Sequence, residues 1–263
     1  MWEWIKSFLS DFAAEIAVLV VTSIFGAILL WYRRIRGKYK FALRLSEMGI
    51  SNIFADRNDY ARYRGTPDLP SYVSSAKRRI VIVGHWMAQG TEIQGVAEAI
   101  ANLVKSPKRI SVDIALVNPR GTNIPSFANY LGLSENETIF RVEQSLSKLN
   151  QARLTLSDEE KGRMRLFVYD TFPVASVVML DPDEVDGRIQ VDMKLFKQSR
   201  QNSFSFEVQG DTPLYRRIRD SWYGVIQNAQ QFDPITLTTT MNALCPADLT
   251  EQEPRRSQGH TVD

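Results

Sequence analysis

An uncharged run near the N-terminus constrains this chain most. From Ile16 to Tyr32 the sequence reads IAVLVVTSIFGAILLWY, 17 residues without a charged side chain. A helix needs about 20 mostly apolar residues, and no fewer than about 17, to cross the hydrocarbon layer of a bilayer. Residues 1–36 therefore predict a single transmembrane helix with its flanks, and the lipid bilayer as a partner.

The flanks of this run predict its orientation. Trp2 and Trp4 precede it and Trp31 and Tyr32 end it, as is typical of membrane interfaces. A cleaved signal peptide is the alternative, but the leading segment is acidic and no small-residue cleavage site follows the run. Basic residues follow without an acid until Glu47. This bias predicts that the C-terminal part of the protein faces the cytoplasm.

Polar and small residues within the run allow a pore. Glu15 lies at its edge, where a carboxylate must reach water, a partner or a channel. Thr22 and Gly26 offer the weakly polar or small surface that helices use to associate in lipid. A single helix cannot enclose a pore, so this interpretation requires a homo-oligomer. The alternative is that Glu15 only reaches outward to the membrane surface.

Composition excludes several classes for the rest of the chain. Hydrophobic residues make up 44% and charged residues 24%, which is typical of a water-soluble domain rather than a multi-pass membrane protein. The formal net charge of +2 predicts no general attraction to nucleic acid. With one cysteine, the chain can form no internal disulfide and no cysteine-built zinc site, and its two histidines make histidine-rich metal sites improbable. We therefore expect no metal and no cofactor.

The remaining chain alternates apolar runs with amphipathic segments, which predicts an α/β domain. We expect a basic helical connector and the entry to the domain over residues 37–78, the α/β domain itself over 79–232, and a polar, disordered tail over 233–263. A βαβ unit is predicted from strand 79–84 through helix 96–104 to strand 110–117. The further segments expected are a helix over 141–156, strands over 165–169, 176–180, 189–193 and 203–208, and a helix over 213–230.

Five segments resemble the small phospholipase D-like domains of bacterial proteins. They read MGISNIFADRNDYARY, AKRRIVIVGHWM, ISVDIALVNPRG, RVEQSLSKL and RLFVYDTFPVASVVMLD. The resemblance implies a phospholipase D-like α/β sandwich. Active members carry H-x-K-x₄-D, in which histidine attacks phosphorus and lysine neutralises phosphate charge. With the aspartate placed on Asp181, the other two positions hold Val174 and Ser176.

Loss of this histidine and lysine predicts a pseudoenzyme without catalytic residues, because neither valine nor serine can replace them. His260 lies in the tail, and no P-loop, G-x-G-x-x-G or G-x-S-x-G occurs. The acidic turn from Asp183 to Gly187 lacks the spacing of a calcium loop, which favours a solvated turn.

A phosphate-bearing ligand is expected beyond the carboxyl ends of the strands. His85 and Trp86 follow the first strand of the βαβ unit and offer a donor and a stacking face. Arg120 follows the second strand, Arg141 opens the next helix, and Lys194 follows a later strand, with Lys197 and Arg200 beyond it. Guanidinium groups suit bidentate phosphate contacts and tryptophan suits base stacking. Each of these residues also has a plain alternative as a packing or solvated side chain.

The combination predicts a membrane effector that senses a nucleotide or short oligonucleotide and controls an oligomeric pore. Its architecture is similar to bacterial antiphage membrane effectors, which implies a place in the bacterial inner membrane, a role in antiviral defence and a ligand-producing enzyme as a further partner. The alternatives are a membrane-anchored phosphodiesterase or nuclease that uses His85, and a non-enzymatic anchor for a protein partner.

Overall fold

The computed structural model describes residue 36 and residues 38–54, 69–87, 91–172, 174–198 and 204–233. The predicted membrane run, with Glu15, Thr22 and Gly26, lies outside these residues, as do Arg200 and nearly all of the predicted tail. Within the described part of the chain, no helix has the length and apolar character needed to cross a bilayer.

One mixed sheet of eight strands organises the domain, in the order β1-β7-β6-β5-β2-β3-β4-β8. Three central strands are parallel: β2 (Arg79–Gly84), β3 (Ser111–Val117) and β4 (Met164–Tyr169). Antiparallel strands extend the β2 side: β5 (Ala175–Leu180), β6 (Arg188–Met193), β7 (Ser205–Gln209) and β1 (Ile50–Phe54). On the other side, the short β8 (Gln230–Gln231) pairs with β4. The predicted βαβ unit and α/β class are confirmed.

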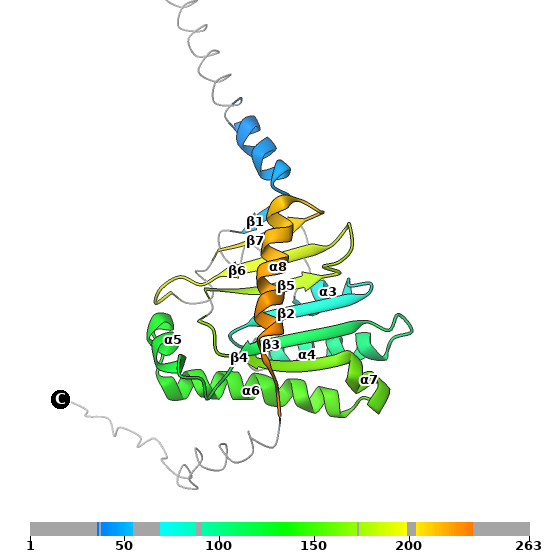
Figure 1. Cartoon of the computed structure of the whole chain (residues 1–263), viewed down its shortest axis with the longest axis vertical. Coiled ribbons are helices and arrows are strands. Elements are labelled where there is room, and N and C mark those ends of the chain that lie inside the picture. The colour runs from blue at the N-terminus through cyan, green and yellow to red at the C-terminus, as the bar shows by residue number, and fades with distance from the viewer. Residues whose placement is uncertain are drawn as a thin grey trace, which may run out of the picture.

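Helices cover both faces of this sheet (Figure 1). On one face lie α3 (Leu69–Ser74), α4 (Thr91–Lys105) and α6 (Glu135–Leu154), and the short α7 (Asp158–Arg163) follows α6. On the other face lie α5 (Ile124–Leu131) and α8 (Pro213–Gln227). Alternate strand residues supply the two cores: Ile80 and Ile82 of β2 face the first helix layer, and Val81 and Val83 face the second. Both faces are therefore buried, which explains the continuous apolar runs.

The sheet reaches into the segment predicted as connector. β1 pairs with β7, and α3 contributes the buried Tyr72 and Val73 to the core. Among the residues that the structure describes, the helix over residues 38–47 stands outside the domain, as Figure 1 shows. The folded domain thus begins upstream of residue 79.

Asp181 ties the end of β5 to the start of β2. Its carboxylate accepts hydrogen bonds from the backbone N–H groups of Lys77, Arg78 and Arg79 at 2.7–2.9 Å. Asp181 is buried and has a left-handed backbone with φ of 49°, a conformation that aspartate and asparagine tolerate best among residues with side chains. It therefore has a structural role at the edge of the sheet opposite to Val174.

Removing this carboxylate should destabilise the domain. Asp181→Ala leaves three backbone donors without their acceptor, so we expect the free energy of unfolding to fall by about 2–3 kcal/mol. Asp181→Asn keeps an acceptor and tolerates the same φ, so it should lose less than half of that. Chemical denaturation of both variants measures the difference. Equal stability of Asp181→Ala and the wild type would contradict the assigned role.

Candidate functional site at the carboxyl edge of the sheet

The carboxyl ends of β2, β3 and β4 meet at one edge of the sheet, where β5 begins and β6 ends. All five ligand-binding residues predicted from the sequence lie at this edge. His85 and Trp86 follow β2, Arg120 follows β3, Lys194 follows β6, and Arg141 lies in the first half of α6. We use the name carboxyl-edge site for His85, Trp86, Arg120, Arg141 and Glu143.

His85 forms the floor of this site rather than its surface. It is only 2% exposed, and its ring stacks on Phe127 of α5 at a centroid distance of 4.6 Å. Its Nδ1 lies 2.9 Å from the Oγ of Ser176 on β5. Gly84 permits this approach, because a Cβ there would lie 3.1 Å from the same Oγ. The ring and Nδ1 of His85 are thus engaged by Phe127 and Ser176, and its role as a ligand donor stays a prediction from the sequence.

Tyr169 fixes the same strand end from the other side. At the end of β4, its hydroxyl donates to the carbonyl oxygen of Gly84 at 3.0 Å. Burial raises the pKa of Tyr169 well above its usual value, so this hydroxyl stays protonated as a donor. The last residues of β2 are thereby contacted by a side chain of the neighbouring β5 and by one of β4, which lies beyond β3, and these contacts position the following Trp86.

Trp86 and Arg141 form the rim. The Arg141 guanidinium carbon lies 5.4 Å from the centre of the Trp86 ring, within the range of a cation–π contact. Glu137, one turn earlier on α6, pairs with Arg141. The backbone N–H of Met87 donates to Ser145 Oγ at 3.1 Å, which joins the β2 end to the same helix. A stacking face and a guanidinium are thus brought side by side from segments more than 50 residues apart.

Glu143 is the functional candidate that the sequence did not reveal. It is 3% exposed, and its Oε1 is buried without a hydrogen-bond partner. Burial raises the pKa of Glu143, while the nearby charge of Arg120 acts in the opposite direction. A buried carboxyl without a partner is costly in a structural role, so it marks this place as a functional candidate.

Lys194 lies at the same edge but farther along it. Its backbone N–H donates to Val174, and its carbonyl accepts from the Tyr130 hydroxyl of α5 at 2.8 Å. Aromatic contacts run from His85 through Phe127 and Phe172 to Tyr130. The lysine therefore borders the site across this aromatic layer.

The three positions that correspond to H-x-K-x₄-D lie at two opposite edges of the sheet. Val174 is exposed beside Lys194, and Ser176 holds His85, so the two lost catalytic positions lie at the carboxyl edge. Asp181 lies at the opposite edge, as described above. Near it, Asp183, Glu184 and Asp186 pair with Arg79, Arg78 and Lys77 respectively. No group of three or more metal-ligating side chains occurs among the described residues.

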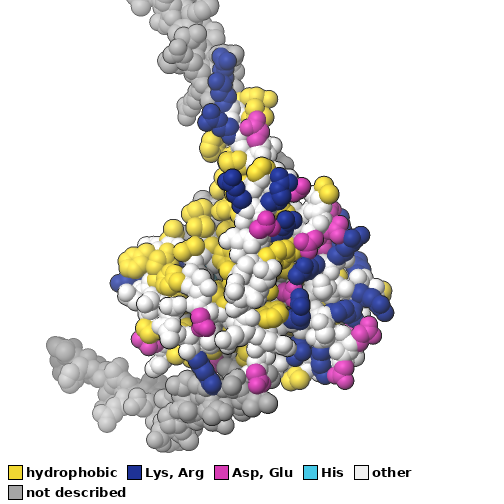
Figure 2. Space-filling model, viewed as in Figure 1, with side chains coloured by type: hydrophobic (Ala, Val, Ile, Leu, Met, Phe, Trp, Pro, Cys, Tyr) yellow, Lys and Arg dark blue, Asp and Glu magenta, His cyan; other side chains and the backbone are white. Residues whose placement is uncertain are grey.

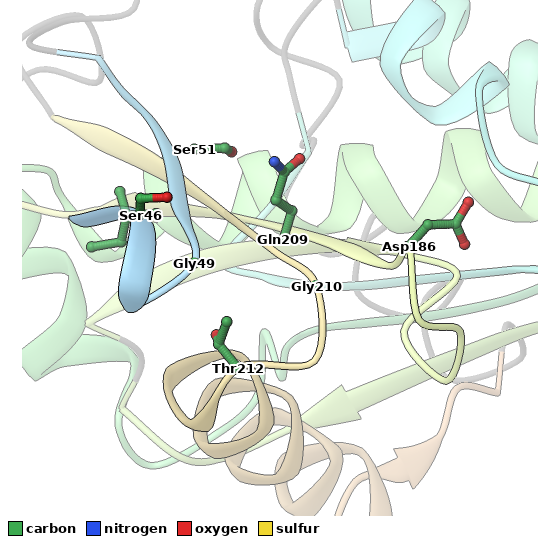
Figure 3. Close-up of a pocket in the computed structure, with 8 residues that line it drawn as sticks. Ser46, Gly49, Ser51, Asp186, Gln209, Gly210 and Thr212 are labelled. Carbon is green, nitrogen blue, oxygen red and sulfur yellow. The ribbon is translucent and has the colours of Figure 1, made fainter. Parts of the chain in front are cut away.

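A cavity of about 460 Å³ opens at that opposite edge (Figure 3). Gly49, Gly210 and the side chains of Ser51, Gln209 and Thr212 line it, together with Ser46, Ile50 and Asp186. Pairing with Lys77 lowers the pKa of Asp186, so a carboxylate stands at its rim. The lining contains neither an aromatic ring nor a guanidinium, so it suits a phosphate-bearing ligand less well than the carboxyl edge.

No protein-family model and no curated protein matches this sequence. Among solved structures, the phospholipase D family member Nuc of Salmonella typhimurium is 11% identical, with a TM-score of 0.39 over 62% of this chain and 88% of its own. Phosphatidylserine synthase of Haemophilus influenzae Rd KW20 is 11% identical, with a TM-score of 0.42 over 64% of this chain and 39% of its own.

The archaeal chromatin protein TrmBL2, whose structure shows a novel mode of DNA binding, is 10% identical. Its TM-score is 0.42, over 78% of this chain and 68% of its own. At such scores these likenesses carry no weight for function, so the phospholipase D-like assignment stays a prediction from the sequence motifs.

The raised pKa of Glu143 predicts how stability depends on pH. A carboxyl whose pKa is higher in the folded state stabilises the fold fully below its unfolded pKa of about 4.3, and this contribution disappears as the pH rises through the folded pKa. Glu143→Gln removes the ionisation. We therefore expect the variant to gain stability relative to the wild type as the pH rises through this window.

Thermal unfolding between pH 4 and pH 8 tests this expectation. Glu135→Gln, on the same helix but exposed, serves as the matched control and should follow the wild type. A constant difference in melting temperature between the wild type and Glu143→Gln across this range would show that the pKa of Glu143 is not raised in the folded state.

Proposed function

We propose that this chain is a membrane-anchored receptor that binds a nucleotide or short oligonucleotide at the carboxyl-edge site and does not cleave it. The observations that carry this proposal lie at one edge of the sheet: the Arg141 guanidinium stands over the Trp86 ring, and the charge of Arg120 acts on the buried Glu143 carboxyl, whose Oε1 has no hydrogen-bond partner. Each group suits a different part of one ligand.

The three kinds of group favour a nucleotide over a bare phosphate. Guanidinium groups recognise phosphate oxygens, and the Trp86 ring offers a stacking surface for a base. The Glu143 carboxyl repels phosphate when ionised but accepts a hydrogen bond from a base amine or a sugar hydroxyl. A ligand that carries such a donor next to its phosphate satisfies all three.

Binding without cleavage agrees with the chemistry of the edge. The two lost motif positions hold an exposed valine and a serine that is engaged with His85. His85 itself is buried beneath Phe127, where an attacking nitrogen has no access to a phosphodiester. Lys194 extends the positive border of the same edge and would contact a longer ligand.

The membrane part of the proposal rests on the sequence. The run from Ile16 to Tyr32 would anchor the chain in the bacterial inner membrane, and self-association would bring Glu15, Thr22 and Gly26 of several copies around a pore. A ligand-producing enzyme would supply the signal, as in antiphage defence. A ligand shifts a closed-to-open equilibrium from 1:99 to 99:1 only if it prefers one state by about 5.5 kcal/mol.

A second candidate function is favoured by one contact. Ser176 Oγ and His85 Nδ1, 2.9 Å apart, have the spacing of a hydroxyl nucleophile and its general base. A membrane-anchored phosphodiesterase using this pair is therefore the rival of the receptor. The burial of His85 argues against it, and the two functions predict different turnover.

Ligand binding is expected to depend on the two guanidinium groups. Arg120→Ala and Arg141→Ala should each weaken binding of a diadenylate to the full chain in detergent by about tenfold, equivalent to about 1.4 kcal/mol. Lys148→Ala, which removes a half-buried cation that contacts Gln151 on the same helix as Arg141, should leave the affinity unchanged. Calorimetric titration measures the effect. Failure of the wild type to bind any mononucleotide, dinucleotide or trinucleotide would reject the receptor.

Turnover separates the receptor from the phosphodiesterase. We expect the full chain to release no nitrophenol from bis(p-nitrophenyl) phosphate above the rate of an empty-membrane preparation, because Val174 stands at the nucleophile position of the motif and His85 is buried. Ser176→Ala should then change nothing in this assay. Turnover by the wild type that disappears in Ser176→Ala would establish the rival function instead.

A further inference from the structure

The helix over residues 38–47 carries apolar side chains that the domain does not cover. Tyr39 is 69% exposed, Phe41 62%, Leu43 48% and the following Met48 42%. None of the residues 38–47 is buried. A surface helix normally buries its apolar stripe against the domain that carries it. Figures 1 and 2 show this helix projecting away from the domain, with hydrophobic and basic side chains side by side.

Contacts at Met48 and Gly49 fix the point where the helix leaves the domain. The hydroxyl of Thr212, the N-cap of α8, donates to the carbonyl of Met48 at 2.9 Å, and the backbone N–H of Gln209 donates to Gly49 at the same distance. Gly49 has φ of +82°, and a Cβ there would lie 2.6 Å from the Thr212 hydroxyl. The direction of the helix is therefore set by contacts that only glycine permits.

The apolar side chains form two stripes. Phe41, Leu45 and Met48 recur at spacings of four and three residues, and Tyr39 and Leu43 at a spacing of four. At 3.6 residues per turn the two stripes lie about 170° apart around the helix. The cations Arg36, Lys40 and Arg44 lie between them on one side. The two stripes therefore face opposite neighbours.

We propose that this helix is the interface between copies of this chain in a closed ring, with the Phe41 stripe of one copy against the Tyr39 stripe of the next. A lipid surface covers one face of an amphipathic helix, and a two-stranded coiled coil uses one seam. Two opposite stripes instead match the head-to-tail contact of a cyclic assembly, in which every copy has the same two neighbours. This inference deepens the proposed self-association and needs no ligand.

Disulfide trapping of the full chain in detergent tests the ring. In a Cys245→Ser background, the double variant Phe41→Cys/Leu43→Cys carries one thiol on each stripe. Thiols of adjacent copies can bond only when their Cα atoms come within about 7 Å. Mild oxidation should therefore give a ladder of trimers and larger species. The single variants Phe41→Cys and Leu43→Cys should stay monomeric, because like stripes do not meet.

Lys40→Cys, on the basic side of the same helix, is the matched control and should also stay monomeric. Dimers from either single variant would show a two-fold pair and overturn the ring. A monomeric double variant would overturn it as well, and labelling of one stripe only by a lipid-borne photoreactive probe would then assign the helix to the membrane surface. Diadenylate binding by the same preparation, measured before oxidation, separates this failure from failure of the proposed ligand site.

Discussion

The pairing of β2 with β5 is the contact on which the rest of the molecule depends. It joins the parallel half of the sheet to the antiparallel half, with Ile80 opposite Leu180 and Val83 opposite Val177. Because the two strands run in opposite directions, the start of one lies beside the end of the other. The Asp181 carboxylate therefore reaches the backbone before β2, while Ser176 reaches His85 after it. The register of this one strand pair therefore positions the contacts at both edges of the sheet.

Strands that are buried on both faces were predictable from the sequence, and elements defined by their neighbours were not. Continuous apolar runs located β2, β3, β4 and β5 to within a residue or two. β1 reads ISNIF, with a polar centre, and becomes a strand because β7 offers an edge, while β8 has only two residues. The short α5 was missed although Pro125 and Gly132 mark its ends.

The site also divides into residues whose place is visible in the sequence and residues whose place depends on neighbouring elements. The topological rule for open sheets placed Trp86 and Arg120 at one edge, because strand ends are visible in the sequence, and Arg141 of the next helix was expected to extend it. The rule does not say which side chains stay exposed, and Phe127 of the missed α5 buries His85. Glu143 reads as one more charge on an amphipathic helix. Its burial follows only from the packing of α6 against the end of the sheet.

Between the carboxyl-edge site and the outer helix lies a connected set of elements that a ligand could bias. β8 pairs with Phe167 and Val168 of β4, the strand whose Tyr169 holds the end of β2. α8 leads directly into β8, and its N-cap Thr212 holds Met48. Such contiguity permits coupling, but only a ligand with different affinities for two arrangements exerts it. In a ring, each copy would add its own differential affinity, so a modest preference at each site would suffice to move the whole assembly.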